Sequence, residues 1–134
     1  MPLKPGAREF LVWLRQQGIR TGIASSNGIE LVETVLKAQG IQEYLESVHT
    51  CCEVPKGKPA PDIYLLVAET LGVKPEECLV FEDVPMGILA GKNAGMRVCA
   101  VEDTFSASQR EEKKELADYY IESYDEIPRE RMQP

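Results

Sequence analysis

The chain has 134 residues, of which 43% are hydrophobic and 28% charged, so it suits one globular domain with a buried core and excludes a disordered chain. Its formal net charge is -7 at pH 7, and the excess acid lies after residue 60, where there are 16 acidic and 8 basic residues. A nucleic acid or an anionic membrane surface is therefore not expected as a partner.

The spacing of the cysteines and the hydropathy of the chain indicate in which cellular compartment the protein is expected. The four cysteines contain no C-x-x-C pair, so reduced thiols fit better than a zinc knuckle or a thioredoxin motif. No apolar stretch approaches the roughly 20 residues that cross a bilayer. We expect a cytoplasmic protein.

Helix and strand signals alternate through the first part of the chain. The apolar spacing predicts a helix that stops at Gly18, a short strand at 20–25 and an amphipathic helix that stops at Gly40. A second strand is predicted at 47–51, before a loop at 55–61 that is rich in glycine and proline.

The alternation continues in the middle of the chain. A helix that stops at Gly72 precedes a continuous apolar strand at 78–81, the pattern of a strand covered on both faces. A helix at 85–94 and a strand at 96–101 follow. Gly87 and Gly91 fall one turn apart and would let that helix approach its neighbours closely.

The last part of the chain is more polar. The segment 106–116 is predicted as a charged surface helix, followed by a short edge strand at 119–121 and a turn at 124–127. Residues 128–134 are expected to form a frayed tail.

This order of elements predicts an α/β fold. Strands that alternate with helices of this length form a three-layer sandwich, with a mainly parallel sheet, right-handed crossovers and helices on both faces. Ligands bind beyond the carboxyl ends of the strands in such sheets, so the residues that follow each strand are the candidates for a site.

Ser25, Ser26 and Asn27 follow the first predicted strand and precede a helix. Free backbone amides and the helix dipole favour an anion at that position, and a serine hydroxyl can donate one more hydrogen bond. The alternative is that Ser26 or Asn27 simply caps the helix.

Lys58 lies in the loop that follows the second predicted strand. Two prolines and a glycine restrict this loop, and a compact ammonium suits the neutralisation of a carboxylate and a phosphate together. The alternative is a solvated lysine, with Asp62 capping the next helix.

Glu82 and Asp83 follow the third predicted strand directly. Two carboxylates at the end of a buried strand repel each other unless a cation or a lysine joins them, and hard oxygen ligands are those that Mg²⁺ prefers. The alternative is that Asp83 caps the following helix while Glu82 faces water.

Taken in order, three motifs resemble the haloacid dehalogenase-like (HAD) superfamily, in the branch of beta-phosphoglucomutase and phosphoglycolate phosphatase. The motifs are the segments 23–27 (IASSN), 58–62 (KPAPD) and 80–83 (VFED), the last followed by Gly87 and Gly91. Each motif is weak alone, but their order and the intervening strand-helix units are specific. The resemblance extends to about Val101.

The resemblance implies a phosphatase or phosphomutase that acts on a small phosphorylated metabolite. Ser25 and Lys58 would be catalytic, and both would bind phosphate together with Ser26 and Asn27. Asp83, with Glu82, would hold Mg²⁺ directly or through water. Groups of this kind position a phosphoryl group and neutralise its oxygens.

The sequence departs from the family at the nucleophile, which is the first aspartate of an Asp-x-Asp motif on a central strand. No two aspartates of this chain are separated by a single residue. We therefore expect residues 1–134 to be a single, partial HAD-like core that lacks this strand and the cap domain, and that is inactive alone. Two apolar strands would then have unpaired inner edges, a route to swapped or self-associated oligomers.

Two other readings stay open. A non-catalytic phosphate-binding or interaction domain could use the same scaffold through Ser25 and Lys58. A receiver-like signalling domain would instead need Asp83 as its phosphorylated aspartate.

Overall fold

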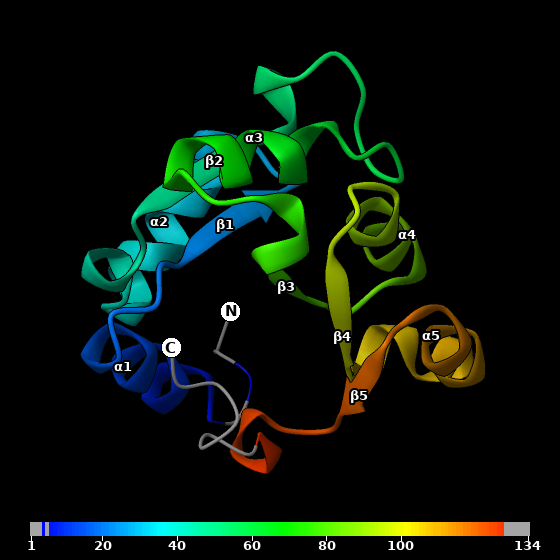
Figure 1. Ribbon diagram of the computed structural model, residues 1–134. Coiled ribbons are helices and arrows are strands. Elements are labelled where there is room, and N and C mark those ends of the chain that lie inside the picture. The colour runs from blue at the N-terminus through cyan, green and yellow to red at the C-terminus, as the bar shows by residue number, and fades with distance from the viewer. Residues whose placement is uncertain (1–3, 5, 128–134) are drawn as a thin grey trace.

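Two separate parallel sheets form the centre of the computed structural model, which describes residue 4 and residues 6–127 (Figure 1). The first sheet pairs β1 (Gly22–Ser25) with β2 (Ser47–Thr50). The second has the order β3 (Leu79–Glu82), β4 (Arg97–Val101) and β5 (Tyr119–Ile121), again all parallel. The predicted α/β fold with parallel strands is confirmed.

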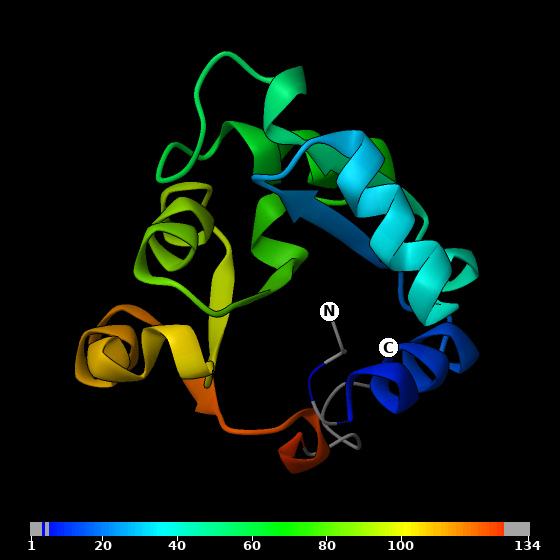
Figure 2. The same ribbon diagram turned by 180° about the vertical axis from the view of Figure 1, so that it is seen from behind.

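Helices connect and cover these strands. The α-helices are α1 (Ala7–Gln16), α2 (Ile29–Gln39), α3 (Asp62–Leu71), α4 (Pro85–Asn93) and α5 (Arg110–Leu116). Helix α3 lies in front of the first sheet in Figure 1, and α2 lies in front of it in Figure 2, so the two cover opposite faces. Helices α4 and α5 pack against the strands of the second sheet. The layers are those of the predicted sandwich.

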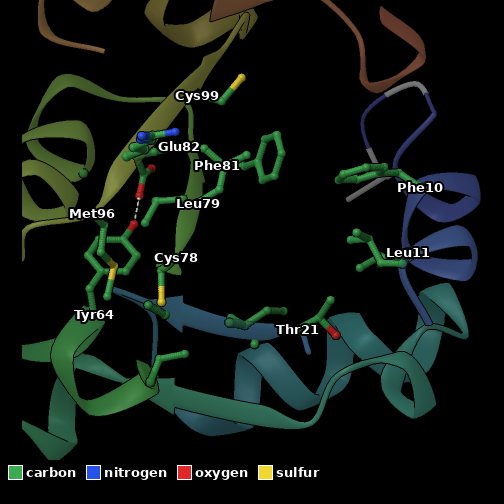
Figure 3. Close-up of a pocket in the computed structure, with 18 of the residues that line it drawn as sticks. Phe10, Leu11, Thr21, Tyr64, Cys78, Leu79, Phe81, Glu82, Met96 and Cys99 are labelled. Carbon is green, nitrogen blue, oxygen red and sulfur yellow. Dashed lines mark hydrogen bonds between the residues drawn. The ribbon is translucent and has the colours of Figure 1, made fainter. Parts of the chain in front are cut away.

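A cleft separates β1 from β3. Within the described residues these two strands belong to different sheets, and a cavity of about 1640 Å³ opens between them. Figure 3 shows Phe10 and Leu11 of α1 on one side of it, with Leu79 and Phe81 of β3 on the other. Among the residues that the structure describes, the facing edges of β1 and β3 have no strand partner.

The two sheets are joined by packing around this cleft. Ile63, Tyr64 and Ala68 of α3 belong to the same buried cluster as residues of β3, β4 and α4. At the other end, the Phe10 ring of α1 meets the Phe81 ring edge-on, with a centroid distance of 5.4 Å. Helices from the first half of the chain thus hold the second sheet in place.

The boundaries differ from the predictions at several elements. Most strands begin or end one or two residues away from their predicted limits, whereas the strand at 119–121 is placed as predicted. The predicted helix at 106–116 is wrong over its first turn, because Thr104–Gln109 is a 3-10 segment with a kink at Ser106. The expected tail at 128–134 lies outside the described residues.

Among the residues that the structure describes, no helix combines the length and the apolar character needed to cross a membrane.

We predict that Gly91→Ala destabilises the fold. A Cβ atom on Gly91 would lie 2.6 Å from Val98 Cγ2 and 3.4 Å from Val80 Cγ2, so α4 would be pushed off the sheet. Overpacking destabilises a core by roughly 1–3 kcal/mol, whereas the better helix propensity of alanine stabilises the helix by up to about 1 kcal/mol. Urea denaturation should show that the free energy of unfolding falls by about 1 kcal/mol. Gly57→Ala is the control, because nothing lies within 4 Å of its Cβ position; equal losses would contradict the close approach.

Candidate functional site

Five of the six predicted site residues line the same cleft. They lie at or beyond the carboxyl ends of β1 and β3 and in the loop before α3, and they are Ser25, Ser26, Lys58, Glu82 and Asp83. Asn27 is exposed and is not among the lining residues. Residues far apart in the sequence therefore meet at one end of the cleft.

Lys58 joins the two sheets. Its Nζ donates a hydrogen bond of 2.8 Å to Oε2 of Glu82, the last residue of β3, and one of 3.2 Å to the carbonyl oxygen of Ala24 in β1. The side chain of Lys58 is only 12% exposed and that of Glu82 only 10%. The loop thus directs this lysine into the cleft instead of into solvent.

Three donors hold the Glu82 carboxylate. Besides Lys58, the Tyr64 hydroxyl donates to Oε2 at 2.6 Å, the contact dashed in Figure 3, and the Asp83 amide donates to Oε1 at 3.1 Å. A Cβ atom on Gly87 of the adjoining α4 would lie 2.0 Å from Glu82 Cδ, so a larger residue there would displace the Glu82 side chain. Glu82 is therefore fixed in one orientation.

The pKa values follow from this packing. Burial raises the pKa of Glu82, but the charge and hydrogen bond of Lys58 and the bond from Tyr64 outweigh it, so this pKa lies below its ordinary value. The pKa of Tyr64 is raised, first by burial and then by the negative charge of Glu82. Glu82 is consequently ionised at neutral pH and paired with Lys58.

Asp83 is more accessible than Glu82. Its side chain is 38% exposed, and Lys4 Nζ lies 3.8 Å from its Oδ2 while contacting Asp103 Oδ1 at 2.9 Å. Burial, together with the hydrogen bond and the charge of Glu82, raises the pKa of Asp83. The ammonium of Lys4 marks a position where positive charge is favoured beside this carboxylate.

Ser25 presents its hydroxyl at the start of α2. Its Oγ accepts a hydrogen bond of 3.0 Å from the Asn27 amide, which leaves the hydroxyl hydrogen available to another acceptor. The capping alternative for Ser26 or Asn27 is wrong, since the N-cap of α2 is Gly28 and no side chain caps it. The small side chains before α2 therefore have no capping role.

The capping alternatives for the two aspartates are also wrong. The N-cap of α3 is Pro61, with Asp62 as the first helical residue, and the N-cap of α4 is Val84. Neither helix has a side-chain cap hydrogen bond. The N-cap residues themselves, Pro61 and Val84, have no polar side-chain atom that could accept a hydrogen bond from the first turn.

Sequence reasoning missed Tyr64. The pattern of α3 suggested only an apolar stripe, and Tyr64 is indeed buried with its neighbours. Its hydroxyl, however, reaches Glu82, and its ring lies 5.1 Å from Lys58 Nζ. The hydroxyl of a buried tyrosine usually has a hydrogen-bond partner, so a tyrosine on the apolar face of a helix was the available signal.

The end of the cleft holds groups of both charges. A lysine and the amides at the start of α2 attract an anion, while the exposed carboxylate of Asp83 attracts a cation. Mg²⁺ is commonly held by one or two carboxylates together with water and substrate phosphates. The described residues contain no group of three acidic, histidine or cysteine side chains that could hold a metal by themselves.

Comparison with known proteins identifies the family. The family model described as haloacid dehalogenase-like hydrolase matches residues 1–95. The chain therefore belongs to the haloacid dehalogenase-like hydrolases.

Individual relatives agree with the predicted branch. Hexitol phosphatase B of Escherichia coli K12 is 32% identical over 126 residues, which are 94% of this chain and 56% of that protein. CbbY of Rhodobacter sphaeroides, solved with xylulose-(1,5)bisphosphate, is 29% identical with a TM-score of 0.86, over 94% of this chain and 56% of that one.

A beta-phosphoglucomutase of Clostridium difficile gives a TM-score of 0.80 at 25% identity, over 98% of this chain and 55% of that one. The predicted resemblance to the beta-phosphoglucomutase branch is thereby confirmed. The chain spans about half the length of the curated relatives it matches.

We predict that Glu82→Gln destabilises the fold more than an exposed Glu→Gln change. The substitution leaves the ammonium of Lys58 buried without a carboxylate, which should cost roughly 3–5 kcal/mol. Glu43→Gln is the matched control, because Glu43 pairs with Arg15 at 4.0 Å on the surface and should cost less than about 1 kcal/mol. Urea denaturation at pH 7 measures both, and equal losses would contradict the buried pair.

The same variant tests the sign of the pKa shift. A folded pKa below the ordinary 4.5 means that Glu82 contributes stability above that value, and that this contribution is lost as pH falls through the lower folded pKa. The stability gap between wild type and Glu82→Gln should therefore narrow in acid. A gap that widens in acid would contradict the assigned direction.

Proposed function

We propose that these residues form part of the active site of a Mg²⁺-dependent phosphatase or phosphomutase that acts on a small phosphorylated metabolite. The observation that carries this is the position of Lys58, which is bonded to Ala24 and Glu82 at the end of a cleft that Ser25 and Asp83 also line. Two relatives, hexitol phosphatase B and a CbbY bound to xylulose-(1,5)bisphosphate, support the substrate class.

In this proposal the phosphate lies between α2 and Lys58. Ser25 donates its hydroxyl hydrogen to a phosphate oxygen, and Ser26 and Asn27 border the positive end of α2, where the first amides of the helix attract an anion. The two contacts of Lys58 use two of the three donors of its ammonium, so the third can meet the phosphate. Positioning and charge neutralisation are the main requirements of phosphoryl transfer.

Asp83 is proposed as the Mg²⁺ ligand, with Glu82 contributing at most through water. The carboxylate of Glu82 already accepts three hydrogen bonds, whereas that of Asp83 is accessible. When bound, the metal would neutralise charge on the transferring phosphoryl group. The part of Glu82 is then to hold Lys58 in its orientation.

The nucleophile is proposed to come from a strand that fills the cleft between β1 and β3. This chain contains no Asp-x-Asp motif, and the cleft is bordered by two strand edges that have no strand partner within the described residues. Neighbouring strands lie about 4.8 Å apart, so one inserted strand could pair with both edges. Its carboxyl end would then reach Ser25, Lys58 and Asp83.

The absence of that motif from the sequence supports a second candidate, a non-catalytic phosphate-binding domain on the same scaffold.

A second copy of the chain could also cover the strand edges, which would give a swapped or self-associated oligomer. Light scattering over a range of concentrations would detect such an assembly.

We expect inorganic phosphate to bind the 134-residue chain weakly, and more tightly when Mg²⁺ is present. Lys58→Met should weaken the affinity at least about tenfold, because it removes a charge-assisted hydrogen bond. Lys56→Met is the matched control, since Lys56 is exposed in the same loop. Isothermal titration calorimetry measures both. Equal effects, or binding indifferent to Mg²⁺, would contradict the proposed site.

Turnover distinguishes the two candidates. The chain alone should hydrolyse p-nitrophenyl phosphate no faster than its Asp83→Asn variant. Addition of a synthetic β-strand peptide that ends in Asp-x-Asp should produce Mg²⁺-dependent hydrolysis that Asp83→Asn abolishes. Phosphate binding without such turnover would favour the non-catalytic domain, and a substantial rate from the chain alone would contradict the need for a further strand.

A further inference from the structure

Lys113 is a buried lysine that the proposed site does not use. It lies in a run of charged residues on α5, where the sequence predicts an exposed face, yet it is 0% exposed in the structure. Its Nζ donates hydrogen bonds of 2.7 Å to the carbonyl oxygen of Val101 and 2.9 Å to Ser106 Oγ. These contacts place a positive charge beneath the carboxyl end of β4.

Ser106 connects this lysine to Asp83. The serine is 2% exposed, and its Oγ donates a hydrogen bond of 2.7 Å to the carbonyl oxygen of Asp83. A hydroxyl has a single hydrogen, so Ser106 must accept from Lys113 in order to donate to Asp83. The direction of the whole chain of bonds is therefore fixed, from Lys113 through Ser106 to Asp83.

Burying this ammonium is costly, and it makes no direct ion pair with a carboxylate of the described residues. Its compensation comes from the two hydrogen bonds and from the charges of Glu102, Asp83 and Asp103 nearby. An apolar side chain of similar length would fill the space without that cost. The bonds that offset this cost lead to the carbonyl oxygen of Asp83, so they hold the backbone beyond β3.

We propose that Lys113 and Ser106 are positioning residues that fix the backbone of Asp83 and so aim its carboxylate at a bound cation. The inference rests on the proposed function, in which Asp83 is the metal ligand. Partners behind a metal ligand commonly change affinity 10–100-fold when they are removed. Lys113 acts through Ser106, so the two should not contribute independently.

The test is a titration of the 134-residue chain with Mn²⁺, followed by electron paramagnetic resonance. Ser106→Ala and Lys113→Met should each weaken Mn²⁺ binding about tenfold. The double variant should bind Mn²⁺ with about the same affinity as the single variant that binds it less tightly, because both changes interrupt one chain of hydrogen bonds. Lys114→Met is the matched control, since Lys114 is the exposed neighbour on α5, and it should bind Mn²⁺ like the wild type.

Two results would overturn the inference: unchanged affinity in both single variants, or single effects that multiply in the double variant. If Lys113→Met does not fold, Ser106→Ala alone decides, because it removes only a hydroxyl group.

The proposed function fails separately, if Asp83→Asn leaves Mn²⁺ binding unchanged. Hydrogen exchange of the backbone amides of residues 82–84 then decides the positioning role. Faster exchange in Ser106→Ala than in wild type supports it, and equal exchange overturns it.

Discussion

The ion pair between Lys58 and Glu82 is the contact on which the rest of the site depends. It lies at the carboxyl ends of β1 and β3, each of which has one edge without a strand partner among the described residues, and the same ammonium also donates a hydrogen bond to the carbonyl of Ala24. A surface ion pair would be too weak for this purpose, but both side chains are nearly buried and Tyr64 holds the carboxylate from a third direction. The two sheets therefore keep a common orientation at the end of the cleft where the candidate residues gather.

The cleft between β1 and β3 separates the proposed binding groups from the position that a nucleophile would have to take. Helices α1 and α3 bridge the two sheets, so the flanking strands keep their places although no described strand joins them. The groups that we propose to bind a phosphate and a cation lie on these flanks. A nucleophile suited to phosphoryl transfer would have to approach from the cleft itself. Binding and catalysis are thus assigned to different segments, and they can be measured separately.

Much of the fold could be predicted because strand and helix periods are local properties of the sequence. The site residues could be proposed because parallel strands present their carboxyl ends at one edge. The roles of Tyr64 and Ser106 could not be predicted, because each depends on a hydrogen bond to a residue far away in the sequence. Tyr64 is 18 residues from Glu82, and Ser106 is 23 residues from Asp83. Lys113 was hidden for a different reason: a lysine within a charged run gives no sign of burial, and only its contacts reveal it.

The central claim is that the inner edges of β1 and β3 are open to a strand. Hydrogen exchange of individual backbone amides, followed by nuclear magnetic resonance, tests it most directly. Strand β4 has a partner on both sides, so its amides should be protected throughout, whereas alternate amides of β1 and β3 should exchange much faster. Uniform protection across all three strands in the chain alone would mean that the edges are already paired, and would contradict the account.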